Sequence, residues 1–150
     1  DVSRLAPLFP SMMEAGRSCV QPEYRTGATI LMLWAAVINH ARRSGARYLM
    51  GCASIPARDG GVCASAIYRG LTAGQLTPED QRVFPYHPLR LVDGVSSTQP
   101  VPPLVKGYLR LGARFCGAPA YDPDFHTADM LVLMDLENMN PRYAKHLLGR

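Results

Sequence analysis

Residues 14–54, EAGRSCVQPEYRTGATILMLWAAVINHARRSGARYLMGCAS, decide the fold class. Residues 12–20 read as an apolar strand that stops at Gln21-Pro22, because proline cannot continue a sheet ladder. Residues 28–43 are apolar on nearly every side, which predicts a buried helix that Gly45 ends. Residues 48–54 then predict a second strand. A strand, helix and strand form a βαβ unit, so we expect two parallel strands with a right-handed crossover.

The turn before this helix is a candidate anion site. Backbone N–H groups at a helix N-terminus bind phosphate readily, and a glycine allows close approach. Thr26, Gly27, Ala28 and Thr29 are placed to cradle a phosphate in this way. Because lone glycine turns are common, an ordinary turn between a strand and a helix remains the alternative.

The rest of the chain alternates between helical and extended patterns. The predicted helices are residues 62–71 with Asp59 as cap, one short turn at 77–80, 104–115 closed by Gly117, and 140–146 with Asn140 as cap. The predicted strands are residues 84–92, 118–121 and 128–135, the last too apolar to be half exposed. The pattern predicts a single α/β domain over residues 1–150, with no internal repeat.

Three basic residues recur every fourth position in the third predicted helix. Lys106, Arg110 and Arg114 would therefore line one side of it. Such a stripe is usually a solvated surface. If a partner docks there, that partner should be acidic.

Composition narrows the function classes. The chain has 150 residues, 47% hydrophobic, and a formal charge of +4, which suits a globular domain with a core. The basic residues are scattered, which argues against nucleic-acid binding. Four cysteines without zinc spacing favour reduced thiols and a cytoplasmic setting. The sequence opens on Asp1, so we expect either a processed chain or a fragment of a longer one.

The common signatures of covalent and nucleotide chemistry are missing from the sequence. It contains no GxSxG elbow, no HExxH pair, no P-loop and no GxGxxG turn. A reaction that needs only positioning and proton transfer leaves a sparse trace of this kind.

Several blocks of sequence resemble one known family. Residues 20–25 before the helix resemble the hallmark of the GNAT N-acetyltransferase fold. Residues 16–20, 48–54 and 102–113 are similar to the acyl-carrier-protein-dependent N-acyltransferases that make lyso-ornithine lipid. Shorter blocks extend the resemblance in the same order, at residues 118–120, 122–125, 128–129 and 142–144.

The resemblance implies a GNAT-like mixed sheet, parallel at its centre and flanked by helices. The family has further N-terminal strands, so we expect this sheet to be incomplete at its N-terminal edge. Ala28 and Ile30 stand where the usual acetyltransferase loop has small, glycine-type residues. This departure favours acyl-phosphopantetheine on acyl-carrier protein over acyl-CoA as the donor, with no permanently bound cofactor and no metal.

The resemblance also implies roles for individual residues. Tyr68 would protonate the departing thiolate, although a core tyrosine is the alternative, and Glu14 would accept the ammonium proton, although it could pair with Arg17. Asp129 would bind the acceptor's amine. Backbone groups around the strand end and the following loop would hold the acyl donor, at Cys19, Val20, Arg25, Thr26, Gly27, Ala28 and Thr29. Lys106, Arg110 and Arg114 would dock the carrier protein.

The implied reaction is direct aminolysis of an acyl thioester. A long-chain (3-hydroxy) acyl group would pass from acyl-carrier protein to the α-amine of ornithine or a similar amino acid, the first step of ornithine-lipid synthesis. Such an enzyme would be cytoplasmic, and peripheral association with the inner face of the membrane is left open. Two alternatives remain: a synthase of signalling N-acyl amino acids, and a non-catalytic module that binds carrier protein.

Overall fold

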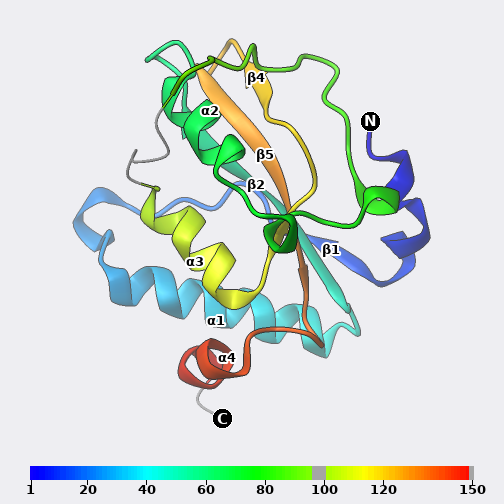
Figure 1. The fold of residues 1–150 in the computed structure, drawn as a ribbon. Coiled ribbons are helices and arrows are strands. Elements are labelled where there is room, and N and C mark those ends of the chain that lie inside the picture. The colour runs from blue at the N-terminus through cyan, green and yellow to red at the C-terminus, as the bar shows by residue number, and fades with distance from the viewer. Residues whose placement is uncertain (96–100, 149–150) are drawn as a thin grey trace.

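A computed structural model of the chain describes residues 1–95 and 101–148, and within these ranges five strands form one sheet flanked by helices. The strands are β1 (Met12–Glu14), β2 (Tyr48–Pro56), β3 (Arg114–Phe115), β4 (Ala120–Asp122) and β5 (Thr127–Asp135). The α-helices are α1 (Gly27–Arg43), α2 (Val62–Arg69), α3 (Pro103–Leu111) and α4 (Pro141–Leu148). Figure 1 shows α1, α3 and α4 gathered at one end of the sheet and α2 at the other. The predicted mixed α/β class is confirmed.

The sheet runs in the order β1-β2-β5-β3, and β4 also pairs with β5. β1 and β2 are parallel, as the βαβ unit predicts. The longest pairing is the antiparallel one between β2 and β5, from Tyr48 opposite Asp135 to Pro56 opposite Thr127. The parallel pair therefore lies at one edge of the described sheet and not at its centre. In the described sheet β1 pairs only with β2, and β5, on the other side of β2, runs antiparallel to it.

Helix α1 begins and ends as predicted, but its burial was predicted wrongly. The Thr26 side chain accepts a hydrogen bond from the Thr29 N–H at the start, and Gly45 follows the end with a φ of 76°. Ile38 and Ala41 are buried, whereas Met32 is 73% exposed. A helix that is apolar on every side buries only the side that meets the sheet. In the described chain, no second layer covers the remaining sides of α1.

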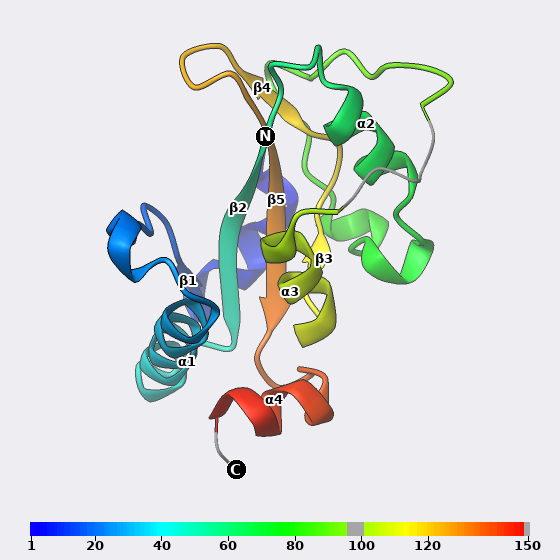
Figure 2. The same ribbon diagram turned by 90° about the vertical axis from the view of Figure 1, so that its left-hand side faces the viewer.

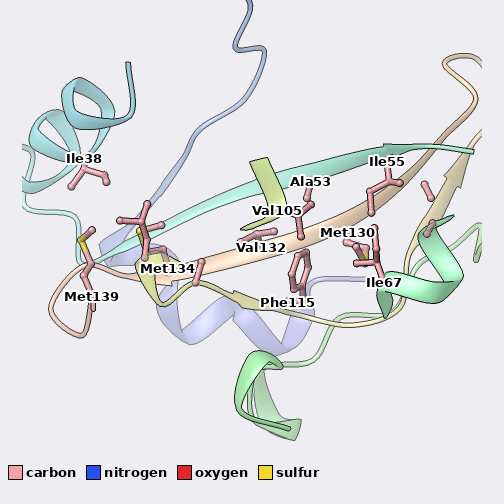
Figure 3. Packing of buried hydrophobic residues seen from close by; sticks show 14 of the residues in the cluster. Ile38, Ala53, Ile55, Ile67, Val105, Phe115, Met130, Val132, Met134 and Met139 are labelled. Atoms are coloured by element: carbon pink, nitrogen blue, oxygen red, sulfur yellow. The ribbon is translucent and has the colours of Figure 1, made fainter. Parts of the chain in front are cut away.

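The two sides of the sheet carry separate clusters of buried residues. The helix side, packed by α1, α2 and α3, holds the main core around Phe115, Val132 and Met130 (Figure 3). The opposite side holds a smaller cluster of Leu5, Val83, Cys116 and Leu133. Leu5 comes from the 3-10 helix η1 (Ser3–Ser11), which packs against this side. On the opposite side, η1 and this small cluster therefore cover only one end of the sheet.

Besides the first predicted strand, which stops at Glu14 instead of Val20, two predicted elements differ in the structure. Residues 84–92 form no strand beyond a single bridge between Pro88 and Ala120, because Pro85 and Pro88 lack the N–H groups that a ladder needs. The helix predicted over residues 104–115 ends at Leu111, where Gly112 adopts a left-handed φ of 92°. Part of the predicted loop 94–103 lies outside the described residues.

The remaining predictions hold with small shifts. Asp59 accepts hydrogen bonds from the N–H groups of Gly61 and Cys63 at the start of α2. Asn140 accepts one from Arg142 at the start of α4. The short turn forms at Glu79–Gln81. No helix in ranges 1–95 and 101–148 is both long and apolar enough to cross a membrane.

Gly117→Ala should destabilise the fold. A Cβ atom on Gly117 would lie 2.4 Å from the Val83 carbonyl oxygen, which belongs to backbone and cannot swing away. Overpacking of this kind costs about 3 kcal/mol. We expect denaturant unfolding to show that loss, while Gly107→Ala, in open space within α3, should gain about 1 kcal/mol through helix propensity. Equal stabilities for the two variants would contradict the packing at Gly117.

Candidate functional site

A cleft opens where β1 separates from β2. The Ala15 N–H donates the last hydrogen bond of this ladder, 2.8 Å long, to the Met50 carbonyl. Beyond it the chain turns away, and Arg17 adopts a left-handed φ of 53° that no strand contains. The first strand is therefore shorter than predicted, and β2 continues to Pro56 without it. Figure 2 shows β1 and the following loop diverging from β2.

The cleft lies between the sheet and helices α1 and α3, has a cavity volume of about 80 Å³, opens to solvent and is mainly apolar. Its floor comes from β2 and β5, one wall from α1, and the Tyr108 side chain of α3 closes it from the other side. The lining residues are Ala15, Ser18, Leu33, Trp34, Val37, Ile38, Leu49, Met50, Gly51, Tyr108, Val132 and Met134. Such a cleft suits a long, flexible and largely apolar group.

Gly51 allows the two diverging strands to stay close at the cleft. A Cβ atom on Gly51 would lie 2.8 Å from the Ala15 carbonyl oxygen. Any side chain at this position would therefore push the end of β1 away from β2. The sequence analysis missed this role, although an isolated glycine in an apolar strand often marks a close backbone approach.

The residues at the end of β1 differ from those predicted. Cys19 and Val20 lie in the loop beyond the strand and do not belong to the cleft lining. The Val20 carbonyl accepts a hydrogen bond of 2.8 Å from Arg25 Nε, which closes the loop on itself. Ala15 and Ser18 occupy the position at the strand end that the prediction gave to Cys19 and Val20.

The predicted anion site lies at the exposed start of α1. Thr26, Gly27 and Ala28 are solvent-exposed there and Thr29 is half-buried, and the Thr26 side chain caps the Thr29 N–H at 3.2 Å. The first N–H groups of a helix lack acceptors within the helix, so this end carries a partial positive charge. Because α1 also forms a wall of the cleft, an anionic group here would sit on the same helix as the apolar wall.

Two carboxylates share the opposite side of the sheet. Glu14 is in register with Met50, and Asp129 with Ser54, so both project to the side away from α1 and α3. Asp129 Oδ1 is buried and has no hydrogen-bond partner among residues 1–95 and 101–148. A buried carboxylate oxygen without a donor favours a cationic group beside it.

Cys52 lies on this same side, between the two carboxylates. Burial raises the pKa of its thiol, and the charges of Asp129 and Glu14 raise it further. Because a thiolate is the nucleophilic form, Cys52 is a poor covalent catalyst at neutral pH.

Alkylation tests this character of Cys52. The pH profile of its reaction with iodoacetamide, followed by mass spectrometry, should have a midpoint above the ordinary value of 9.0. The reaction of Cys19 in the same sample provides an internal reference for reagent and time. A midpoint at or below 9.0 for Cys52 would contradict this electrostatic environment.

The two candidate tyrosines lie in different places. Tyr68, on α2, is half-buried against the main core and does not belong to the cleft lining. Tyr108, on α3, does belong to it, and its ring lies 4.5 Å from that of Trp34 between centroids. Tyr108 was not predicted as a site residue, because nothing in the local sequence marks a residue that tertiary packing brings to a site.

The predicted basic stripe is wrong in one member. Lys106 and Arg110 lie exposed on α3. Arg114 belongs to β3 instead, in register with Leu133, whose side chain is in the cluster on the opposite side of the sheet. The helix ends before Arg114, so the three cations do not share a surface.

Comparisons with known proteins agree on one family. Residues 1–35 match a family model described as an acetyltransferase (GNAT) domain. The chain is 32% identical over 99% of its length to the L-ornithine N(alpha)-acyltransferase of Agrobacterium fabrum, and 32% identical over 97% to that of Brucella abortus. The enzyme of the same name from Rhodobacter capsulatus is 34% identical over 97% of the chain. No solved structure gives a significant match.

The matches cover only part of the relatives. The chain corresponds to 54% of the Agrobacterium protein, 56% of the Brucella protein and 61% of the Rhodobacter protein. The chain thus spans about half the length of the curated relatives it matches.

Proposed function

Since the chain belongs to the family of the L-ornithine N(alpha)-acyltransferases, we propose that it transfers a long-chain acyl group, 3-hydroxylated or not, from a thioester to the α-amine of ornithine or a similar amino acid. The observation that carries the proposal is the cleft between β1 and β2, with apolar walls on one side of the sheet and carboxylates on the other. The product is a precursor of a membrane lipid.

The cleft supports the donor part of the proposal. An acyl-phosphopantetheine carries its phosphate at one end, and the start of α1 offers it the N–H groups of Gly27 and Ala28, flanked by Thr26 and Thr29. The pantetheine arm then follows α1 into the apolar cleft, past Leu33 and Trp34. The thioester reaches the point where Ala15 and Gly51 approach each other.

We further propose that acyl-carrier protein, and not CoA, presents the acyl group. Arg25 is committed to the Val20 carbonyl, and Ala28 occupies a position where a more open loop would have glycine. A single phosphodiester needs fewer hydrogen-bond donors and less space in this loop than a pyrophosphate does. Carrier proteins of this kind are acidic, and the exposed Lys106 and Arg110 on α3 supply complementary charge beside the cleft.

The acceptor part of the proposal rests on the two carboxylates. The buried Oδ1 of Asp129 accepts no hydrogen bond from the described residues. An ammonium group of the amino-acid acceptor would donate the missing hydrogen bond. Glu14, the last residue of β1, lies next to the point where the thioester ends. Asp129 therefore binds the acceptor, and Glu14 accepts the proton that the reacting ammonium must lose.

The step itself is direct aminolysis. The amine lone pair attacks the thioester carbonyl carbon, the tetrahedral intermediate collapses, and the carbon–sulfur bond breaks to leave the amide and a thiol. Backbone groups at the end of β1 are placed to orient the carbonyl for attack. The raised pKa of the Cys52 thiol, due first to burial, argues against an acyl-enzyme on that residue.

A product assay tests the proposal. The full-length protein is incubated with long-chain acyl-carrier protein or the matching acyl-CoA, each with ornithine, lysine, tyrosine or buffer, and products are identified by mass. We expect an N-acyl amide of ornithine, formed faster from the carrier-bound donor. An N-acyl tyrosine would indicate a synthase of signalling amides, and the absence of any amide would overturn the proposal.

A further inference from the structure

The cleft contains one acidic proton donor of suitable chemistry. Most of its lining side chains are aliphatic, and the polar exceptions include Ser18, Trp34 and Tyr108. A serine hydroxyl and an indole N–H lose their protons only far above the range of a phenol, whose usual pKa is about 10. Among the described lining residues, Tyr108 is thus the side chain able to give a proton to a departing thiolate.

The Tyr108 ring is held in place by its neighbours. It lies against Trp34 of α1 with ring centroids 4.5 Å apart and planes tilted by 30°. Its own carbonyl accepts the Ala113 N–H, which closes the C-terminal end of α3. The tyrosine therefore spans the cleft from α3 to α1, across the strands that form the floor.

Tyr108 also lies near the reacting end of the cleft. It lines the same cleft as Ala15 and Gly51, the two residues where the thioester is proposed to end. Burial raises the pKa of the Tyr108 hydroxyl above its ordinary value, so the phenol is protonated at neutral pH. A proton donor must be in this state before the reaction.

Tyr68 lacks these properties. It lies on α2, at the other end of the sheet from α1 and α4 (Figures 1 and 2). Its side chain packs against the main core and is absent from the cleft lining.

We propose that Tyr108, and not Tyr68, is the catalytic acid that protonates the departing thiolate; this rests on the proposed acyl transfer. As the carbon–sulfur bond breaks, its electron pair leaves with sulfur, and the Tyr108 hydroxyl proton passes to that sulfur. The phenolate recovers a proton from water. The proton lost by the amine goes separately to Glu14, so charge and atoms balance.

Donors with different leaving thiols test the proposal. The full-length wild type, Tyr108→Phe and Tyr68→Phe are compared with a pantetheine thioester and with an aryl thioester of the same acyl group, whose thiol is acidic enough to leave unprotonated. Thiol release is followed directly, with ornithine or hydroxylamine as acceptor. For Tyr108→Phe we expect about a tenfold lower kcat with the pantetheine thioester and a change within twofold with the aryl thioester.

The other outcomes contradict either the assignment of Tyr108 or the proposed function, and the two kinds of failure are distinguishable. An equal loss with both donors shows that Tyr108 acts by packing, and a donor-dependent loss in Tyr68→Phe transfers the role to Tyr68. Thiol release with hydroxylamine but not with ornithine refutes the proposed acceptor and leaves Tyr108 testable. If the wild type cleaves neither thioester with either acceptor, the proposed function and this inference both fail.

Discussion

Glu14→Gln is expected to lower kcat about 100-fold, with little change in the KM for the amino acid. The amide keeps the size and polarity of the carboxylate but cannot take up the ammonium proton. Glu14 ends β1 beside the cleft, where its side chain lies on the acceptor side of the sheet. Steady-state kinetics with ornithine and a saturating carrier-bound donor measures both constants.

Asp129→Asn provides the matched control for Glu14→Gln. Asp129 shares the same side of the sheet, but its buried oxygen is assigned to binding and not to proton transfer. Its amide variant should raise KM for the amino acid about tenfold and change kcat less, because one charged hydrogen bond to the acceptor is lost. The opposite division of effects would exchange the two roles, and unchanged kinetics in both variants would remove both carboxylates from the mechanism.

Gly51→Ala is expected to lower kcat/KM about 100-fold, because a small displacement of reacting groups has effects of that size. The new methyl group would meet the Ala15 carbonyl at 2.8 Å and push the end of β1 from β2. Both the wall of the cleft and the adjacent Glu14 would then move. The assay uses the pantetheine thioester and ornithine, at a temperature where thermal melting shows that the variant is folded.

Two other glycine variants separate geometry from stability. Gly74→Ala adds a methyl group with no atom within 4 Å and should leave activity unchanged. Gly117→Ala strains backbone away from the cleft and should reduce stability without reducing kcat below the melting temperature. If Gly51→Ala retains activity within threefold of the wild type, Gly51 has no part in shaping the site.

Local patterns in the sequence were sufficient for the main elements. The βαβ unit followed from proline at Pro22, an apolar helix and a second apolar run, and the structure confirms its parallel pairing. Residues 128–135 were apolar enough to be placed inside, and β5 is the strand that pairs with three others. Caps at Asp59 and Asn140 followed from the short range of their hydrogen bonds.

Features that depend on distant contacts were not predictable in the same way. Apolar residues all around α1 do not reveal which side meets the sheet, so Leu31 was expected inside and is 49% exposed. The strand ended earlier because Arg17 turns left-handed, a conformation without a signature in its residue type. The tyrosine in the cleft comes from α3, distant in sequence from the strands that form the floor, whereas the family resemblance directed attention to Tyr68.

The uneven lengths of the strand ladders make the two walls of the cleft mechanically different. β5 is paired on both edges and carries the long ladder to β2, so separating it requires unfolding of the core. Among the described residues, β1 is held to β2 by a ladder of three residue pairs. Segments held by few hydrogen bonds open locally at lower free energy than strands in the core. The cleft therefore has a rigid floor, formed by β2 and β5, and a more flexible side, formed by β1. When acyl donors of different bulk bind, we expect β1, which carries Glu14, to move.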